Sequence, residues 1–237
     1  MNAPAPSHEP QPGLFSLQEA GLAALLMGLV NFIGAGLIAL GAWPEEINGL
    51  AGNLAMEAGL ALGVGAILFR RRLSWQDAFG LRAPLWPRAI AIGLLGCAAL
   101  LPVTFLLHSL SLHLFTRWGG PAGDQPAIQW LLNNHDPLFR SLLFVQAVMI
   151  APLCEELFFR GLLLQALRRH YSTPMAIGLS AFFFAAFHFN LPATLPLFAI
   201  ASGFAVAYLY TRSLAAAIVM HAAYNLINYA WAIWLKP

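Results

Sequence analysis

Seven long stretches of the chain are nearly free of charged residues, and this pattern limits the fold more than any other feature. They are residues 20–44, 47–69, 89–116, 141–167, two parts of 170–211, and 213–235. A helix needs about 20 apolar residues to cross a bilayer core, where the backbone must satisfy its own hydrogen bonds. The polar and proline-containing sequence from His188 to Pro196 divides 170–211 into a fifth helix and a short sixth. The sequence therefore predicts an all-α, polytopic transmembrane helical bundle of about seven membrane helices, within a range of six to eight.

The composition supports a membrane environment and excludes several classes of protein. Hydrophobic residues make up 59% of the chain and charged residues only 9%, whereas about a quarter of the residues in a soluble domain are charged. The net charge of +2 is too small to predict a nucleic-acid partner. The two cysteines, Cys97 and Cys154, form neither a disulfide framework nor a zinc-ribbon pattern. We therefore expect an integral membrane protein surrounded mainly by lipid.

The segments outside the apolar stretches predict the domain organisation and the orientation. Residues 1–13 contain four prolines and no Lys or Arg, so we expect a disordered leader before a single transmembrane domain over 14–237. Most arginines fall in three loops that lie on one side if seven helices alternate. These are Arg70, Arg71, Arg72, Arg82, Arg88, Arg168, Arg169 and Arg212. Because cytoplasmic loops are rich in Lys and Arg, we expect a cytoplasmic N-terminus in the plasma (inner) membrane.

The fourth stretch carries two adjacent acids and an arginine in the sequence Cys154-Glu155-Glu156-Leu-Phe-Phe-Arg160. A charge at the bilayer centre costs about 2.5–3.5 kcal/mol even on the most lenient scale, so it usually faces an interior cavity and has a partner. Glu156 and Arg160 share a helix face, whereas Glu155 points about 100° away. We therefore expect a buried Glu156–Arg160 pair and an unpaired Glu155 that can act as a base. The alternative is that these residues only join neighbouring helices or line an ion path.

Polar residues of two later helices lie at a similar depth in the membrane. His188 lies at the end of the fifth helix, and His221 and Asn225 share one face of the seventh. At 1.5 Å per residue from the predicted cytoplasmic ends, Glu155, His188 and Asn225 lie about 20 Å deep. His221 lies about 13 Å deep on the same scale. Each residue alone fits a hydrogen bond between helices, but their common depth predicts a single site.

Three short motifs in the second half of the chain resemble those of a known family. They are Glu155-Glu156-x-x-x-Arg160, Phe184-x-x-x-His188 and His221-x-x-x-Asn225. In order and spacing they match the motifs of the CPBP family, which comprises CAAX proteases and bacteriocin-processing enzymes. This family is also called the Abi or type II CAAX prenyl endopeptidase-like family. The resemblance covers about residues 138–228, which we expect to form the catalytic core.

The resemblance implies an intramembrane endopeptidase in which Glu155 activates a water molecule for attack on a peptide carbonyl. His188 would position that water or bind a metal, and His221 and Asn225 would hold the metal or stabilise the oxyanion. The adjacent ion pair would orient these groups. The implied substrate is a protein or peptide, either a prenylated CAAX-type C-terminus or another membrane-bound chain cleaved near its C-terminus.

The residues leave open whether the site uses a metal ion. A zinc site would draw on Glu155, His188 and His221, with water in the fourth position. A metal-free Glu and His site accounts for the same residues, and the chain has no His-Glu-x-x-His pair. Cys154 is an alternative nucleophile, although burial in apolar surroundings disfavours its thiolate. Glu57, in the second stretch, is a further intramembrane acid that could line the cavity or bind an Asn or Ser side chain.

Two other functions fit the sequence less completely. A non-catalytic immunity or scaffold protein could bind a partner through the same cavity, but such a protein could lose Glu155 freely, and here the motif residues are complete. An ion-coupled transporter could use the buried acids and histidines. Transporters often have two related halves with broken helices, whereas these polar residues lie in one half of the chain. The sequence does not indicate the oligomeric state.

Overall fold

The computed structural model describes residues 14–41, 43–82, 85–119 and 125–235, and all regular structure in these ranges is helical. The leader predicted over residues 1–13 lies outside the described residues. The α-helices are α1 (Leu17–Ala39), α2 (Glu45–Arg71), α3 (Trp75–Phe79), α4 (Trp86–Arg117), α5 (Pro126–Asn133), α6 (Pro137–Val145), α7 (Ala151–Glu156), α8 (Gln165–Leu167), α9 (Thr173–Ala186), α10 (Thr194–Thr211) and α11 (Leu214–Leu235). Two π-helical segments, η2 (Gln146–Ile150) and η3 (Leu157–Leu164), and a short 3-10 helix, η4 (Leu191–Ala193), complete the described structure.

In the part of the chain that the structure describes, five helical stretches are long and apolar enough to cross a membrane. They are Leu17–Ala39, Glu45–Arg71, Trp86–Arg117, Pro137–Leu167 and Leu191–Thr211. Together with α9, which has 14 residues, and α11, which has 22, they account for the seven stretches predicted from the sequence. The prediction of an all-α helical membrane bundle is therefore confirmed.

The prediction of a short sixth helix was wrong, because α9 is the shorter helix of that pair. The α10 helix has 18 residues, and η4 extends it to a span of 21 residues. Pro192 and Pro196 lie in the first turns of η4 and α10, where a missing amide proton costs no helical hydrogen bond. The Asn190 side chain caps this start by accepting a hydrogen bond from the Ala193 amide at 3.0 Å. Residues 188–190 therefore form the connection, and the helical structure of the next span already begins at Leu191.

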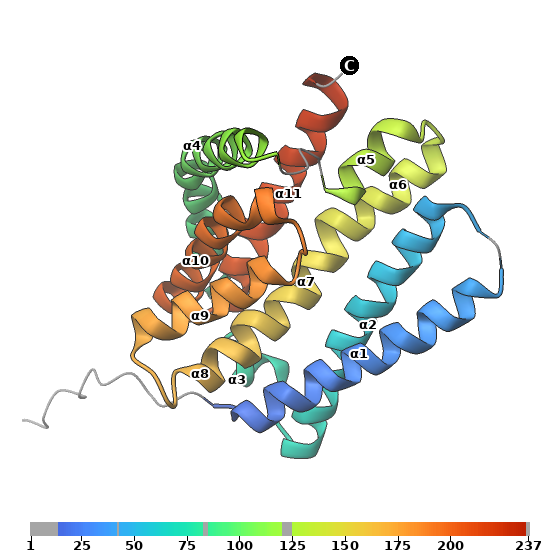
Figure 1. Ribbon diagram of the computed structural model, residues 1–237. Helices are drawn as coiled ribbons and strands as arrows, with labels where there is room; N and C mark the ends of the chain where they lie inside the picture. The colour runs from blue at the N-terminus through green and yellow to red at the C-terminus, as the bar shows by residue number, and fades with distance from the viewer. Residues whose placement is uncertain (1–13, 42, 83–84, 120–124, 236–237) are drawn as a thin grey trace, which may run out of the picture.

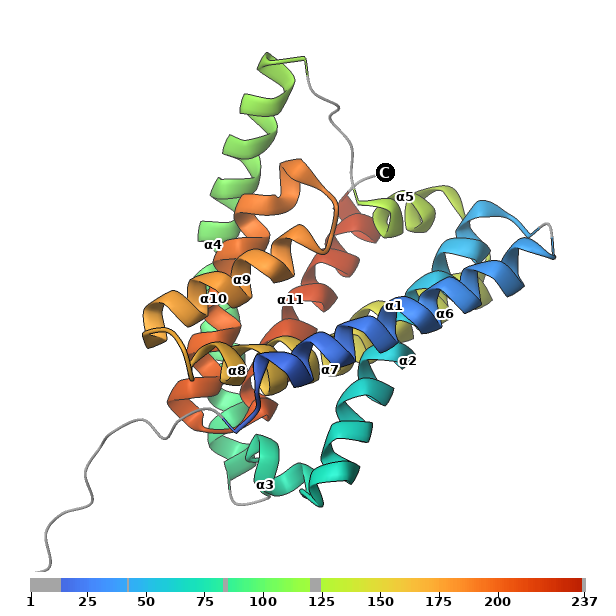
Figure 2. The ribbon, with the colours of Figure 1, turned by 60° about the horizontal axis from the view of Figure 1, so that its bottom comes forward.

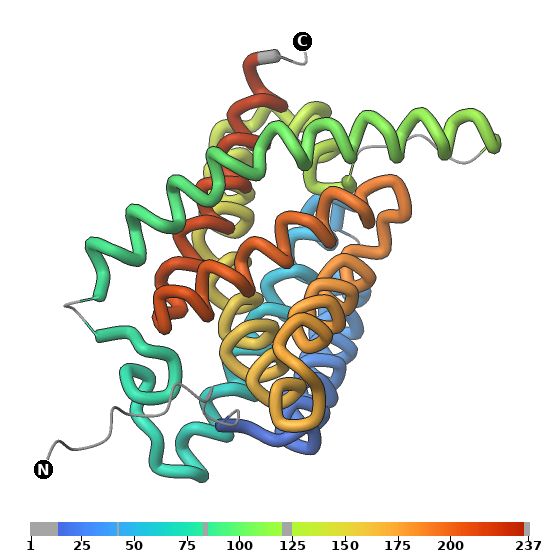
Figure 3. The backbone as a smooth tube through the Cα atoms, turned by 90° about the vertical axis from the view of Figure 1, so that its left-hand side faces the viewer, coloured from blue at the N-terminus to red at the C-terminus, as the bar shows by residue number. Residues whose placement is uncertain are grey.

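The continuous helix formed by α6, η2, α7, η3 and α8 runs through the centre of the bundle (Figure 1). On one side, α2 packs against α7 and η3, and α1 packs against η3 and α8. On the other side, α9 packs against η3, and α11 packs against α7 and η2. The α4 helix crosses α10 and α11 (Figure 3), and its far end projects beyond its neighbours (Figure 2). The central helix therefore contacts elements from both halves of the chain.

The central helix is widened on both sides of the predicted acids. The π segments η2 and η3 flank α7, whose last two residues are Glu155 and Glu156. Pro152, in the first turn of α7, cannot donate the hydrogen bond that an α-helix requires there, and this accounts for the wider turn of η2. π-Helical turns inside α-helices occur frequently at functional sites.

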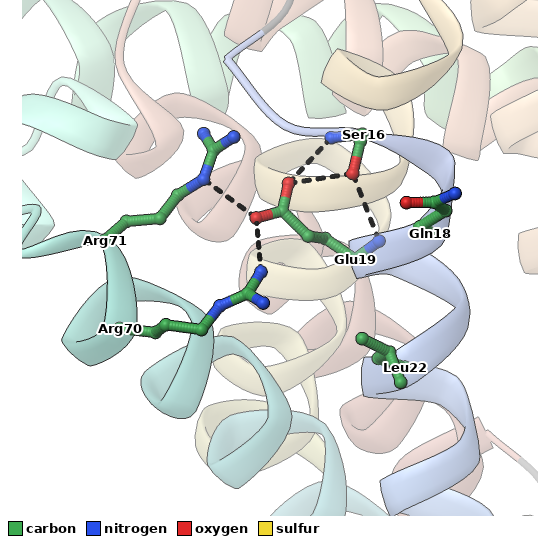
Figure 4. Close-up of a pocket in the computed structure, with 6 residues that line it drawn as sticks. All are labelled: Ser16, Gln18, Glu19, Leu22, Arg70 and Arg71. Atoms are coloured by element: carbon green, nitrogen blue, oxygen red, sulfur yellow. Dashed lines mark hydrogen bonds and ion pairs between the residues drawn. The ribbon is translucent and has the colours of Figure 1, made fainter.

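The first turn of α1 is fixed to the end of α2 by a buried carboxylate (Figure 4). Glu19 accepts from Arg70 Nη2 at 3.0 Å and from Arg71 Nε at 2.8 Å, and its own side chain is only 5% exposed. Glu19 and Ser16 also form a reciprocal capping box at the start of α1. The Phe15 side chain is fully buried beneath Arg71, whose guanidinium lies 5.6 Å from the ring centre. We call this set the N-terminal clamp.

The arginine-rich loops meet at this same end of the bundle. The Leu14 amide donates to Gln165 Oε1 at 3.1 Å, and its carbonyl accepts from Arg71 at 2.6 Å. Gly80 has a φ of 66°, and a Cβ at that position would collide with the Arg212 carbonyl, so only glycine fits there. The loops after α2, α8 and α10, which the sequence assigned to one side, are therefore neighbours in space.

Candidate active site

The predicted ion pair between Glu156 and Arg160 is present and fully buried. Arg160 Nη1 lies 2.7 Å from Glu156 Oε1, and both side chains are 0% exposed. Arg160 Nη2 donates to the Ala201 carbonyl of α10 at 2.9 Å. The guanidinium lies 4.7 Å from the ring centre of Phe184 and 5.0 Å from that of Phe204. A buried ion pair is tolerated when hydrogen bonds and favourable ring faces replace the lost water, and this pair has both.

His221 of α11 connects the two glutamates of α7. Its Nδ1 lies 3.0 Å from Glu156 Oε1, and its Nε2 lies 3.8 Å from Glu155 Oε2. Because Glu156 is an ionised acceptor paired with Arg160, the Nδ1 atom carries the proton of that contact. The imidazole also stacks on Phe204, with 4.6 Å between ring centres and 19° between ring planes. The ring is therefore held in one orientation with its Nε2 directed toward Glu155.

Glu155 is the more exposed of the two acids and is not paired with an arginine. Its side chain is 12% exposed, whereas that of Glu156 is 0% exposed. Its buried Oε2 atom has no hydrogen-bond partner among the described residues. An ionised carboxylate can accept several hydrogen bonds, so this oxygen has room for one from water or substrate. Glu156 is thus paired with Arg160, whereas Glu155 lies beside His221. The role of Glu155 as a base stays a prediction.

His188 lies in the turn that follows α9, beside this group but not bonded to it. Its Nδ1 lies 2.8 Å from the Phe184 carbonyl, which can only accept, so Nδ1 is the protonated nitrogen and Nε2 is free to accept. The Phe184 ring contacts both imidazoles, with its centre 4.8 Å from His188 and 5.5 Å from His221. His188 is also within electrostatic range of Arg160. Because the Phe184 ring also faces the Arg160 guanidinium, it lies beside residues of all three motifs.

Asn225 lies one turn beyond His221 on the same face of α11. Its Nδ2 donates to the Ala147 carbonyl in η2 at 2.8 Å. The amide nitrogen has a second proton that this bond does not use. All six predicted residues thus come from α7 and η3 of the central helix, the turn after α9, and α11.

Two buried polar residues beside this group carried only a weak signal in the sequence. Gln146 of η2 donates to Glu57 of α2, and the two side chains are 5% and 1% exposed. The sequence predicts an Asn or Ser partner for Glu57, but the partner in the structure is Gln146. A glutamine in a membrane helix, nine residues before Glu155 in the sequence, was the available signal.

The residues proposed as zinc ligands do not form a ligand group as they lie. Among the described residues, no three or more His, Cys, Asp or Glu side chains come together in a way that could hold a metal ion. The bond of His188 Nδ1 to the Phe184 carbonyl leaves Nε2 available, an arrangement that is common among metal-binding histidines. Glu155, His188 and His221 do not come together as ligands in this structure, and a zinc site stays a prediction.

A comparison with protein families identifies the same part of the chain. Residues 137–227 match the family described as type II CAAX prenyl endopeptidase Rce1-like. This part of the chain is therefore similar to the Rce1-like family. The matched segment begins with α6, ends within α11 and contains all six predicted site residues. The family is one of membrane proteases that act on protein or peptide substrates. No curated protein and no solved structure gives a match.

Proposed function

We propose that the protein is an intramembrane endopeptidase that uses Glu155 to activate water and cleaves a membrane-bound protein near its C-terminus. The observation that carries this proposal is the unequal pair of acids at the end of α7. Glu156 is neutralised by Arg160 at 2.7 Å, whereas Glu155 has a free oxygen and faces His221 Nε2 at 3.8 Å. The Rce1-like match supports peptide-bond hydrolysis as the reaction.

The proposed reaction begins with proton transfer from water to Glu155. The water oxygen attacks the carbonyl carbon of the scissile peptide as Glu155 takes the proton, and the carbonyl electrons move to oxygen. The protonated Glu155 then delivers the proton to the leaving nitrogen as the C–N bond breaks. The products are a carboxylic acid, an amine and ionised Glu155, so atoms and charge balance.

The two histidines and Asn225 have distinct roles in this proposal. His188 Nε2, which the Phe184 bond leaves free to accept, would hold the attacking water. The unused N–H of Asn225 would donate to the developing oxyanion, where a placed donor has its largest effect. His221, fixed by Glu156 and Phe204, lies beside Glu155 and would help to fix its position. Glu156 and Arg160 do not touch the substrate and serve to position His221.

A pair of matched peptides tests the reaction and the substrate class together. The purified protein in lipid vesicles is given one peptide with a farnesylated C-terminal CAAX sequence and one with the same sequence and no lipid, and products are identified by mass spectrometry. Cleavage of the lipidated peptide near its C-terminus supports the proposal. Equal cleavage of both supports an endopeptidase that does not select the prenyl group. No cleavage of any membrane-bound peptide, with binding intact, indicates a non-catalytic binding protein instead.

We expect chelation of metal ions to leave this cleavage within about twofold of the untreated rate. The expectation follows from the side chains of Glu155, His188 and His221, which do not assemble as a ligand set. Protein dialysed against EDTA or 1,10-phenanthroline is compared with untreated protein, and its metal content is measured in parallel. Loss of activity that returns when zinc is added back would contradict the metal-free assignment.

A further inference from the structure

Glu57 brings a third acid from α2 toward the two acids of α7. Its side chain is 1% exposed, and α2 packs directly against α7 and η3. Glu57 lies within electrostatic range of Glu155 and of the Cys154 thiol. It lies outside residues 137–227, so neither the three motifs nor the family match accounts for an acid kept at this depth. An acid inside a membrane helix is costly and commonly marks a functional site.

The side-chain amide of Gln146 bonds Glu57 to η2, and Asn225 of α11 bonds to the same turn of the central helix. Gln146 Nε2 donates to Glu57 Oε1. The next residue, Ala147, accepts the hydrogen bond of Asn225 at 2.8 Å. The π segment η2 therefore contacts Glu57 on one side and the proposed oxyanion donor on the other. A movement of the Glu57 side chain would therefore also move Gln146 in η2.

Glu57 and Glu155 have different neighbours. Two nearby carboxylates in a low-dielectric environment cannot both be ionised at low cost. Glu155 faces His221 Nε2 at 3.8 Å. Glu57 instead has the neutral Gln146 amide as its hydrogen-bond donor. The proton of the pair therefore belongs on Glu57.

The other helices packed against α2 do not alter this balance. In the described part of α1, the charged residue is Glu19, which is bound to Arg70 and Arg71 at the far end of α2. The α5 helix and η2 contain no ionisable side chain. Arg160 of η3 is paired with Glu156. The groups that act on Glu57 are therefore Gln146, Glu155 and Cys154.

We propose that Glu57 is a positioning residue of the site, a neutral carboxyl whose Oε2 hydroxyl donates a hydrogen bond to Glu155 or to the water bound there. The Oε2 atoms of Glu57 and Glu155 are both buried and without hydrogen-bond partners among the described residues. A protonated Glu57 supplies a donor, and an ionised Glu155 supplies an acceptor. The inference rests on the proposed role of Glu155 as the base. Glu57 would hold that base and its water in the attacking geometry.

Two substitutions test whether Glu57 acts as a neutral hydrogen-bond donor or as a charged carboxylate. Glu57→Gln keeps a neutral donor at this position, so we expect kcat within about threefold of the wild type. Glu57→Ala removes the donor, so we expect kcat to fall about 10- to 100-fold, with KM little changed, as for loss of one hydrogen bond to a charged group. Glu45→Gln, at the exposed start of the same helix, is the matched control and should be unchanged. Size-exclusion chromatography and thermal unfolding in detergent check that each variant folds.

The pH dependence of cleavage activity distinguishes a proton-donating Glu57 from a Glu57 with a purely structural role. We expect the wild type to lose activity at alkaline pH as Glu57 releases its proton. The Glu57→Gln variant should retain activity there, because an amide does not ionise. This comparison decides the question even if Glu57→Ala fails to fold. Superimposable profiles, or a Glu57→Gln variant as inactive as Glu57→Ala, would overturn the inference.

The same assays distinguish this inference from the function on which it rests. If the wild type cleaves no peptide, the proposed function fails, and the role of Glu57 fails with it. If the wild type cleaves, Glu155→Gln does not, and Glu57→Ala matches the wild type, only the inference about Glu57 is wrong.

Discussion

Glu155→Gln should lower kcat for peptide cleavage by about 10²- to 10⁴-fold, the usual contribution of a general base. The amide is nearly the same size as the carboxylate but cannot take a proton from water. Because the side chain is 12% exposed and makes no ion pair with an arginine, we expect the fold and the thermal stability to change little. Initial rates with a lipidated peptide in vesicles, measured beside thermal unfolding of the same preparation, check both parts.

Cys154→Ala is the control for this prediction, since the thiol adjoins Glu155 in the sequence and is also buried. We expect that variant to cleave at close to the wild-type rate. The reverse pattern, an active Glu155→Gln protein and an inactive Cys154→Ala protein, would assign nucleophilic catalysis to the cysteine. Comparable activity in both variants would place the reaction elsewhere in the chain.

Arg160→Met should destabilise the protein by about 3–5 kcal/mol, because it leaves the buried Glu156 carboxylate without its cation. Both side chains are 0% exposed, so water cannot replace the lost contact. The Ala201 carbonyl would also lose its hydrogen bond from Nη2. We expect activity to fall as well, since Glu156 fixes His221. Unfolding in detergent by heat or denaturant measures the stability.

Two further variants separate charge compensation from simple loss of packing. The double variant Glu156→Gln with Arg160→Met removes both charges and should recover much of the stability, but not the activity. Arg82→Met breaks an exposed pair with Asp77, whose side chains are 64% and 60% exposed, and should leave stability unchanged. A single Arg160→Met protein as stable as the wild type would show that the Glu156 charge needs no partner.

The helical bundle and the grouping of site residues could be predicted because lipid imposes strict local rules. Uncharged stretches must be helical there, and spacing of four residues places Glu156 with Arg160 on one face of a helix. Both rules act within one element, so a single sequence is enough. The boundary between α9 and α10 was misplaced because proline at the start of a helix and proline in a loop look alike in sequence.

The contacts that depend on several elements could not be predicted in this way. The wide turns of η2 and η3 rotate α7 by an amount that spacing rules for an α-helix do not contain. The bond between Gln146 and Glu57 joins residues 89 positions apart. The bond of His188 to the Phe184 carbonyl fixes which nitrogen is free, a detail set by the local turn. These features decide the orientation of the site groups, and they appear only once the helices are packed.

The N-terminal clamp gives a way to map the protein across its membrane. Leu14 is bonded to α8 and α2, and α11 starts near this end and finishes at the opposite one (Figure 1). Tags placed before Leu14 and after Leu235 would therefore emerge from opposite faces of the bilayer. A reagent that cannot cross lipid would label one tag in intact vesicles and both tags in opened ones. The identity of the tag protected in whole cells would assign the arginine-rich face to the interior or the exterior.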